Sequence, residues 1–329
     1  MELNGLLMMD WLGKPVWMWA LFLLFVVVLL VVDLGIFHHD QHEIGVQESL
    51  KMSAAYIALG VLFGGWVWWE LGAESGLLYL TGFVVEKSLA IDNVFVIAMI
   101  FTALSIPRKY QHRVLFWGIL GVIVLRGVMI GVGAALVQEM AWILYIFAAF
   151  LIFSGFKLLW LAGQEEEMDI NKNPLLKFLR KYGRVANELH GQKFLVRLKD
   201  NNTGHYAWYM TPLLVALLLV EVADVIFAVD SVPAIFAITT DAYLVFTSNI
   251  MAILGLRALY FALSAMMERF KYLKYALAIL LIFIGSKMFI ADMFGLMKFP
   301  PVASLSITFL ILAVGVGYSL WKTRNLAKG

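Results

Sequence analysis

The sequence predicts an all-α polytopic membrane protein with about nine transmembrane helices. Hydrophobic residues make up 62% of the 329 residues and charged residues only 15%, against about 25% in typical soluble domains. The mean hydropathy is +0.86. Nine crossings of roughly 20 apolar residues each would use about half of the chain. This composition argues against a soluble globular enzyme, a nucleic-acid-binding protein and a disordered chain, and the net charge of +2 is too small to indicate a polyanionic partner.

Nine apolar runs are the candidate spans. They cover residues 17–37, 53–71, 77–101, 114–136, 141–161, 208–238, 244–266, 272–292 and 301–321. The first run follows Glu2, Asp10 and Lys14 instead of a basic segment, and it is long enough to cross a bilayer. We therefore expect a retained helix and not a cleaved signal peptide. The run 208–238 is longer than one crossing needs, which predicts an irregularity within it.

The distribution of lysine and arginine predicts the orientation of these spans. With nine crossings, 18 of the 25 basic residues fall in loops on one side and two, Lys14 and Lys298, on the other, while five lie inside spans. Basic loops stay in the cytoplasm. The N-terminus is therefore expected outside and the C-terminus in the cytoplasm.

Five segments follow from this arrangement. They are two N-terminal spans (1–76), a three-helix unit (77–161), a charged cytoplasmic loop (162–206), a second three-helix unit (207–292), and a last span with a basic tail (293–329). The loop is expected to hold an amphipathic helix or a partly disordered linker, and its role stays open.

The two three-helix units resemble each other. Leu89–Ile97 aligns with Phe227–Ile235, Leu125–Arg126 with Leu256–Arg257, and Leu151–Lys157 with Leu281–Lys287, at offsets of 138, 131 and 130 residues. Chance similarity between apolar helices would not place Asp, Arg and Lys in register. Because each unit has an odd number of spans, the second enters from the opposite face. The sequence thus predicts an inverted 3+3 helix repeat, an architecture of many secondary transporters.

Ionisable residues occur inside the predicted spans. They are Asp33, Glu86, Asp92, Glu221, Asp224 and Asp230, with Lys87, Arg126, Lys157, Arg257 and Lys287. Each costs at least about 2.5–3.5 kcal/mol near the midplane, so such residues indicate a functional site. The alternative is a structural network in which acids and bases neutralise each other. We expect Asp33, near the end of its span, to be interfacial.

The spacing of the acids limits how they can bind an ion. Glu86 and Asp92 are six residues apart, as are Asp224 and Asp230, which in an unbroken helix is about 9 Å of rise. Two such carboxylates could bind one small ion only if the helix unwinds between them. Alternatively, each repeat could contribute one carboxylate to a shared site. Pro233 favours unwinding because it cannot donate to the carbonyl of Val229.

The oxygen groups near the midplane favour a hard divalent cation. They are Glu86, Asp92, Glu221, Asp224 and Asp230, with the amide of Asn93 and the hydroxyl of Ser231. The chain has no cysteine, which excludes disulfides, thiolate sites and cysteine nucleophiles. All-oxygen coordination suits Mg²⁺, Ca²⁺ or Mn²⁺, and the same carboxylates could carry protons. A second cluster, His38, His39 and His42, is expected to be an ordinary interfacial loop, with metal binding as the less favoured reading.

The charged motifs resemble the TerC/Alx family of integral membrane proteins, which is grouped with the LysE-type exporters. The resemblance spans about residues 79–288 and rests on Glu86–Val96, Glu221–Phe236, Ser248–Tyr260 and Leu273–Tyr275. It implies a bacterial plasma (inner) membrane protein linked to manganese export, metal homeostasis and alkaline pH response. The family name refers to tellurite resistance.

Together these observations predict a secondary transporter that exports a divalent cation, most favourably Mn²⁺, from the cytoplasm. Asp92 and Asp230 are the expected paired ligands; Glu86, Asp224, Glu221, Asn93 and Ser231 complete the sphere or relay protons. Arg126 and Arg257 are expected to hold the carboxylates when no ion is bound, with Lys87, Lys157 and Lys287 as further supporting charges. No nucleotide-binding motif is present, so we expect coupling to protons and no enzymatic activity. The alternative is a membrane assembly or stress-response protein that does not transport.

Overall fold

The computed structural model describes most of the chain as helix. The described residues are 7–37, 46–140, 142–162, 176–179, 184–186, 188–199, 205–264, 270, 272–296 and 299–323. The helices are α2 (Val16–Phe37), α3 (Val46–Leu71), α4 (Ala73–Ala103), α5 (Arg108–Glu139), α6 (Ile143–Ala162), α8 (Pro212–Phe236), α9 (Ala242–Ile253), α10 (Leu256–Ser264), α11 (Leu273–Met293) and α12 (Pro301–Lys322). Two antiparallel hairpins accompany them, β1 (Asp10–Trp11) with β2 (Lys14–Pro15) and β3 (Leu195–Lys199) with β4 (Tyr206–Met210).

Seven of these helices are long and apolar enough to cross a membrane. They are α2, α3, α5, α6, α8, α11 and α12, and the bent pair α9–α10 makes an eighth candidate. Large apolar side chains on their outer faces are exposed, for example Leu24, Val128 and Phe153 at 60%, 61% and 64%. Such surface is stable against lipid and not against water. The chain is therefore an all-α polytopic membrane protein.

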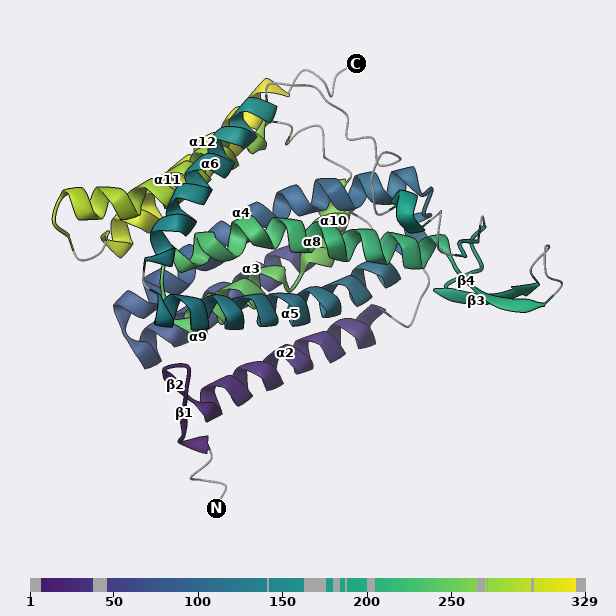
Figure 1. The fold of residues 1–329 in the computed structure, drawn as a ribbon, viewed down its shortest axis with the longest axis horizontal. Helices are drawn as coiled ribbons and strands as arrows, with labels where there is room; N and C mark the ends of the chain where they lie inside the picture. The colour runs from purple at the N-terminus through teal and green to yellow at the C-terminus, as the bar shows by residue number, and fades with distance from the viewer. Residues whose placement is uncertain are drawn as a thin grey trace.

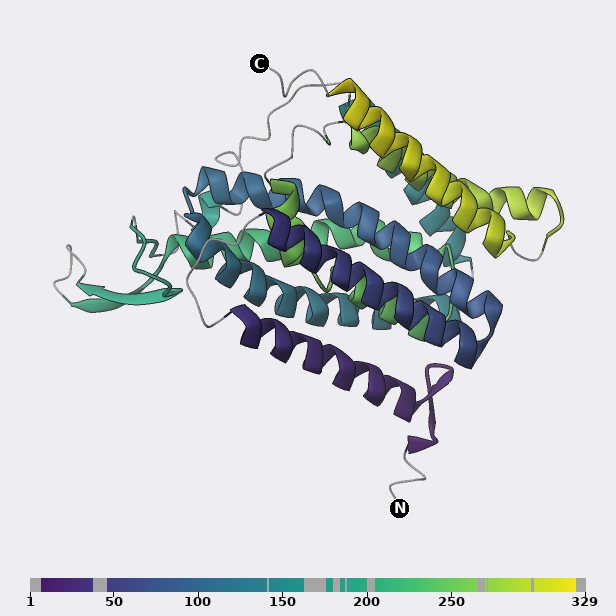
Figure 2. The same ribbon diagram turned by 180° about the vertical axis from the view of Figure 1, so that it is seen from behind.

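The helices form two groups that are inclined to each other. Figure 1 shows α2, α3, α4, α5, α8, α9 and α10 running side by side, while α6, α11 and α12 form a second group at an angle to them. The view from behind shows the same division (Figure 2). In the first group, aromatic rings pack around Tyr243, which meets Trp19 edge to face with ring centroids 5.1 Å apart.

Helix α4 has the length of a span but an unusual composition. It contains 31 residues, and Glu86, Lys87 and Asp92 lie in its middle. This helix packs against α3, α8, α9 and α12. Glu86 and Lys87 are therefore surrounded by other helices of the bundle, which is the location expected of charges in a membrane-spanning protein.

The crossing of α6 and α11 is built on two glycines that the sequence repeat matches. A Cβ added to Gly155 would lie 2.8 Å from the carbonyl oxygen of Ala278, and one added to Gly285 would lie 2.5 Å from that of Ala148. Such small residues let the two backbones approach closely. Ala148 and Gly155 each lie 130 residues before Ala278 and Gly285, so the same contact occurs twice with the two helices exchanged.

The sequence predicts a helix irregularity within residues 208–238, but the structure has none there. Helix α8 is continuous from Pro212 to Phe236, with Pro233 inside it. The excess length of the apolar run belongs instead to strand β4, which ends at Met210. Pro233 lies three residues before the end of the helix, where little of the hydrogen-bond ladder follows it. The chain breaks in the next span, between α9 and α10, which are bent by 42°.

The described part of the 162–206 loop contains a β-hairpin where an amphipathic helix or linker was expected. Strand β3 pairs with β4 from Leu195↔Met210 to Lys199↔Tyr206. Among the described residues between 163 and 206, those from 176 to 179 form a short helical turn. Strand β4 runs to Met210, past the predicted boundary at 206. In β3, the buried Val196 alternates with exposed neighbours and marks the inward face of the strand.

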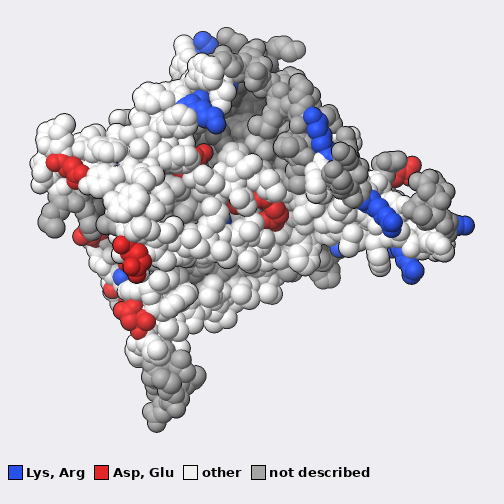
Figure 3. Space-filling view, viewed as in Figure 1, with Lys and Arg blue, Asp and Glu red and all other residues white. Residues whose placement is uncertain are grey.

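The charged residues differ between the two ends of the molecule. Figure 3 shows Lys and Arg around the β3–β4 hairpin, whereas Asp and Glu predominate at the opposite end, where β1 and β2 lie. Arg108, Lys109 and Arg113 at the start of α5 belong to the basic end, and Glu74 at the start of α4 to the acidic end.

Candidate metal site

A buried arginine joins carboxylates from two neighbouring helices. Arg126 of α5 is 1% exposed. Its Nη1 donates to Glu86 of α4, and its Nη2 and Nε donate to the two carboxylate oxygens of Asp224 of α8 at 2.9 and 3.2 Å. Glu86 and Asp224 are themselves 138 residues apart, the offset of the aligned repeat. The structure therefore places matched acids of the two units on one guanidinium.

Uncharged polar groups complete this network. Arg126 Nη1 also donates to Ser231 Oγ at 2.9 Å and to Asn249 Oδ1 at 3.4 Å, and Asn93 Nδ2 donates to Asp224 Oδ1 at 3.4 Å. Buried polar atoms are normally paired in this way. Within the described residues, however, Glu86 Oε2 and Asn249 Nδ2 are buried without a hydrogen-bond partner. Glu86 thus keeps one carboxylate oxygen available to a ligand.

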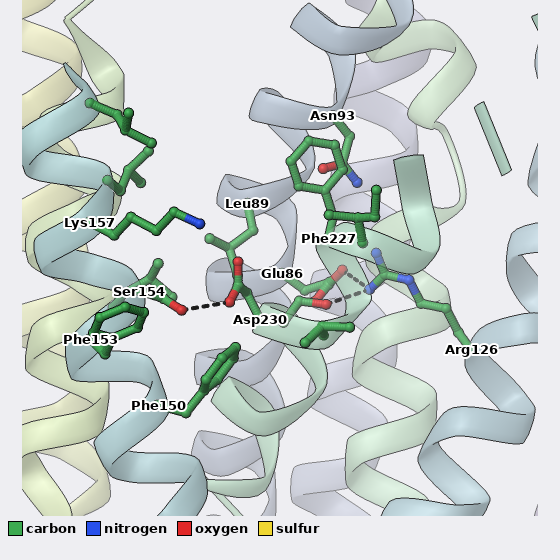
Figure 4. A pocket seen from close by; sticks show the side chains of 16 residues that line it. Glu86, Leu89, Asn93, Arg126, Phe150, Phe153, Ser154, Lys157, Phe227 and Asp230 are labelled. Carbon is green, nitrogen blue, oxygen red and sulfur yellow. Dashed lines mark hydrogen bonds and ion pairs between the residues drawn. The ribbon is translucent and has the colours of Figure 1, made fainter. Parts of the chain in front are cut away.

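A cavity of about 400 Å³ opens beside this network. It lies between α6 and the helices α4, α5 and α8, and Figure 4 shows Glu86, Arg126, Asp230 and Lys157 around it. Asp230 accepts a hydrogen bond of 2.8 Å from Ser154 of α6. Asn93 and Ser231 also line the cavity, and Leu89, Phe150 and Phe227 are among its apolar walls. Oxygen atoms from α4, α6 and α8 therefore converge on one partly apolar space.

The charges of this region leave a place for a cation. The acids Glu86, Asp224 and Asp230 stand beside the bases Arg126 and Lys157, an excess of one acid over the bases when all are ionised. Among the described side chains, no group of three or more His, Cys, Asp or Glu surrounds a single point. A cation entering the cavity would instead meet Asp230 and the available oxygen of Glu86. It would compete with Arg126 for Glu86.

Three of the five predicted acidic ligands are not among the described residues that line the cavity, and one of them, Asp224, is held by Arg126. The backbone of Asp92 lies in α4, six residues beyond Glu86, but its side chain is outside the described residues. Glu221 packs over Gly121 of α5, and its Oε2 is buried with no hydrogen-bond partner in the described part of the chain. Helices α4 and α8 are both continuous, so a site formed by unwinding around Asp230 is not present.

The predicted supporting charges separate into different places. Lys157 lines the cavity with Asp230. Lys87 points away from Glu86 and donates to backbone carbonyls of α9 and the turn after it. Lys287 is buried 3.5 Å from Ser304 Oγ, beside a second cavity of about 260 Å³.

Arg257 pairs with a carboxylate outside the cavity. It forms an ion pair with Asp33 of α2, and Asp33, expected at the interface, is only 7% exposed. A sequence offset cannot reveal this pair, because α2 lies outside the repeat. The predicted histidine cluster of His38, His39 and His42 lies outside the described residues.

Two polar residues of the site were not singled out from the sequence. Ser154 binds Asp230, and Asn249 binds Arg126. The available signal was a polar residue within an apolar run, but hydroxyl and amide side chains also occur in membrane helices as packing contacts. Their role becomes visible only when α6 and α9 are placed against α8 and α5.

Comparisons with known proteins agree with the membrane fold. A relative from Myxococcus xanthus, an uncharacterized membrane protein, is 44% identical over 95% of this chain and 94% of its own length. The Escherichia coli K12 protein Alx, named as a proposed membrane-bound redox modulator, is 42% identical over 95% of this chain and 97% of its own. An uncharacterized membrane protein of Rickettsia bellii is 45% identical over 91% of this chain and 95% of its own length. No solved structure matches the chain.

The family profile covers most of the helical bundle. Residues 71–327 match the profile described as the integral membrane protein TerC family. The matched segment begins just before α4 and includes both three-helix units and α12. With its candidate spans and bacterial relatives, the chain is a multi-pass bacterial membrane protein. It belongs to the integral membrane protein TerC family.

Proposed function

We propose that this protein is a secondary transporter that exports a divalent metal cation from the cytoplasm. The observation that carries the proposal is the junction of Glu86 and Asp224 on Arg126, next to a cavity lined by Asp230. Buried ionisable groups inside a membrane bundle are costly and mark ion pathways by default. Here they come from matched positions of two units, which is where inverted-repeat transporters bind their substrates.

The proposed topology has nine crossings, with α4 as the ninth span. Its charged middle excludes it from the apolar candidates, but the Arg126 network offsets the cost of Glu86. The basic end near β3–β4 would face the cytoplasm, which puts the N-terminus outside. The doubled glycine contact between α6 and α11 supports the inverted repeat, as does the pairing of α5 with α8 and of α4 with α9.

The chemistry of the cavity favours a hard divalent cation. Its polar lining offers carboxylate, amide and hydroxyl oxygens from Glu86, Asp230, Asn93 and Ser231, and the described lining residues include no cysteine or histidine. Such ligands suit Mg²⁺, Ca²⁺ and Mn²⁺. The family resemblance favours Mn²⁺ among the three. In this proposal Asp92, Asp224 and Glu221 take part either as further ligands or as proton carriers.

Arg126 would act as a resident counter-charge. While the cavity holds no cation, the guanidinium compensates Glu86 and Asp224. Cation binding at Asp230 and Glu86 would weaken the bond between Arg126 and Glu86, while the two-pronged contact with Asp224 keeps the arginine in place. The carboxylates that exchange the metal can also take up protons after its release.

Exchange with protons would supply the energy. Moving a dication outward against about 150 mV costs about 7 kcal/mol, and the entry of two protons per ion cancels this electrical term. We propose no enzymatic reaction, since the polar groups of the cavity suffice to bind and release an ion. The competing function is a non-transporting assembly or stress-response role. A redox role, as in the name of the relative from Escherichia coli, could not use thiol chemistry here because the chain has no cysteine.

Direct measurement of metal binding tests the proposal. We expect purified protein in detergent to bind Mn²⁺, followed by the loss of the free-ion electron paramagnetic resonance signal, and Asp230→Asn to weaken binding at least tenfold. Glu139→Gln is the matched control, because Glu139 is an exposed acid at the end of α5. Equal binding by all three proteins, or none by the wild type with Mn²⁺, Mg²⁺ or Ca²⁺, would favour the non-transporting function.

A further inference from the structure

The break between α9 and α10 leaves backbone carbonyls at the end of α9. The two helices meet at 42°, and Gly255 takes a φ of +81°, which favours glycine. An added Cβ at Gly255 would lie 2.6 Å from the ring of Tyr56. In a continuous helix the carbonyl of Ala252 would accept the N–H of Leu256. The bend separates these two groups within the bundle.

The ammonium group of Lys87 occupies this position. Lys87 Nζ donates to the carbonyl oxygen of Ala252 at 2.9 Å and to that of Leu254 at 3.3 Å. The lysine comes from α4, which packs along α9. Among the described residues, no carboxylate forms an ion pair with it. Its positive charge is therefore balanced by carbonyl oxygens at the C-terminal, partially negative end of a helix.

The matched interface in the other half of the protein lacks both features. Helix α5 is continuous where α9–α10 is broken, and the position 138 residues after Lys87 is Val225. Gly121, which matches Ala252 at the offset of 131, is covered there by the carboxylate of Glu221. The lysine and the helix break thus occur together on one side of the repeat. This points to a specific pairing of the cation with the freed carbonyls.

We propose that the carbonyl end of α9 is a binding site for a monovalent cation and that Lys87 is its tethered occupant. Broken helices in membrane transporters use freed carbonyls and helix C-termini to hold such ions. Here the ammonium group takes the place of a free alkali cation such as Na⁺ or K⁺. Because Lys87 follows Glu86 directly, α4 connects the carbonyl site to the Arg126 network. Removal of the amine opens the site to an alkali cation from solution.

Salt-dependent stability of a lysine variant tests this site. We expect wild-type protein in detergent to melt at the same temperature in NaCl, KCl and choline chloride of equal ionic strength. Lys87→Ala should melt several degrees lower in choline chloride and recover part of that loss as Na⁺ or K⁺ is added, since a bound ligand stabilises the folded state. Lys287→Ala is the matched control: Lys287 is also buried in a span, but among the described residues its ammonium group donates to the hydroxyl of Ser304 and not to the carbonyls of a helix end.

The proposal is overturned if Lys87→Ala melts at one temperature in all three salts, or if wild type and Lys287→Ala respond to alkali cations as strongly. Should Lys87→Ala not fold, Lys87→Met, which keeps the apolar stem, is purified in the same salts. Folding that requires Na⁺ or K⁺ supports the site, and failure in every salt contradicts it. No divalent metal is added, so the outcome is independent of metal export.

Discussion

At the residue scale, the stability of the core depends on the balance of charges around Arg126. The guanidinium compensates Glu86 and Asp224 in a region with almost no exposure. Removing one partner of a buried ion pair leaves an uncompensated charge and costs about 3–5 kcal/mol, whereas removing the whole set can be neutral. Comparing single and combined substitutions of Arg126, Glu86 and Asp224 therefore separates their contribution to stability from a contribution to ligand binding.

Arg126→Met should destabilise the protein strongly, because Glu86 and Asp224 would then face each other without a counter-charge. We expect a melting temperature in detergent well below that of the wild type. The combined variant Arg126→Met, Glu86→Gln and Asp224→Asn should regain most of the loss. A single variant as stable as the wild type, or a triple variant less stable than the single one, would contradict this account.

The Asp33–Arg257 pair should be structural only. Asp33→Asn removes the charge that balances Arg257 in a buried pair, so thermal stability should fall. Mn²⁺ affinity of the folded fraction should stay within about twofold of the wild type, since neither residue lines the cavity. Binding lost in parallel with Asp230→Asn would show that this pair belongs to the metal pathway.

The sequence indicates which residues are unusual, but not which of them meet. The 138-residue offset relates Glu86 to Asp224, and the structure brings both to Arg126. The offset between Arg126 and Arg257 predicts similar roles, but it does not reveal that Arg257 pairs with Asp33 of α2, a helix outside the repeat. Local periodicity carries no information on such a partner, which depends on how the helices pack.

At the scale of elements, the crossing of α6 and α11 requires glycine at its closest point. Each backbone approaches the other near Gly155 or Gly285. A methyl group there meets a carbonyl oxygen of the opposing helix, which cannot move without displacing that helix. Close approach of this kind is a common basis for helix association in membranes.

Gly285→Ala should therefore weaken the contact between α6 and α11. We expect a lower melting temperature, corresponding to about 1–3 kcal/mol for an overpacked site. Gly131→Ala in α5 and Gly317→Ala in α12 are controls, since an added Cβ there has no neighbour within 4 Å. These changes should be neutral or slightly stabilising. An equal effect at all three positions would contradict the close crossing.

Helix breaks were harder to predict than helices. The nine apolar runs correspond to the described helices, with α9 and α10 sharing one run. Pro233 suggested unwinding in α8, but it lies close enough to the helix end to be tolerated. The bend occurs at Leu254–Gly255, where a single glycine within an apolar run gave no strong signal. The contacts of Lys87 and Tyr56 that accompany it are tertiary.

At the scale of the whole molecule, the asymmetry of charge predicts a sided arrangement in the membrane. The β3–β4 hairpin lies at the basic end, and the turn between α8 and α9 lies at the end with Glu74 and Asp241. Composition alone fixed the membrane class and the helical fold. The sequence analysis did not predict the β3–β4 hairpin, because a strand of five residues such as β3 has the same mixture of polar and apolar residues as an irregular loop.

Labelling of single cysteines should reveal this topology, since the chain contains none of its own. Thr240→Cys lies between α8 and α9 and Lys199→Cys lies in β3, and both positions are exposed. In intact cells a membrane-impermeant maleimide should label the first variant, and it should label the second only after lysis. The opposite pattern would reverse the proposed orientation, and labelling of both in intact cells would contradict the number of crossings.

The most direct test of the account is Mn²⁺ flux into or out of proteoliposomes, with and without an imposed pH gradient. Wild-type protein is compared with Asp92→Asn, Asp230→Asn and the control Glu139→Gln, all checked for folding by their melting temperatures. We predict flux that depends on the pH gradient in the wild type and the control, and its loss in the two aspartate variants. Absence of flux of Mn²⁺, Mg²⁺ and Ca²⁺ from well-folded wild-type protein, or undiminished flux in both aspartate variants, would contradict the proposed exporter and its site.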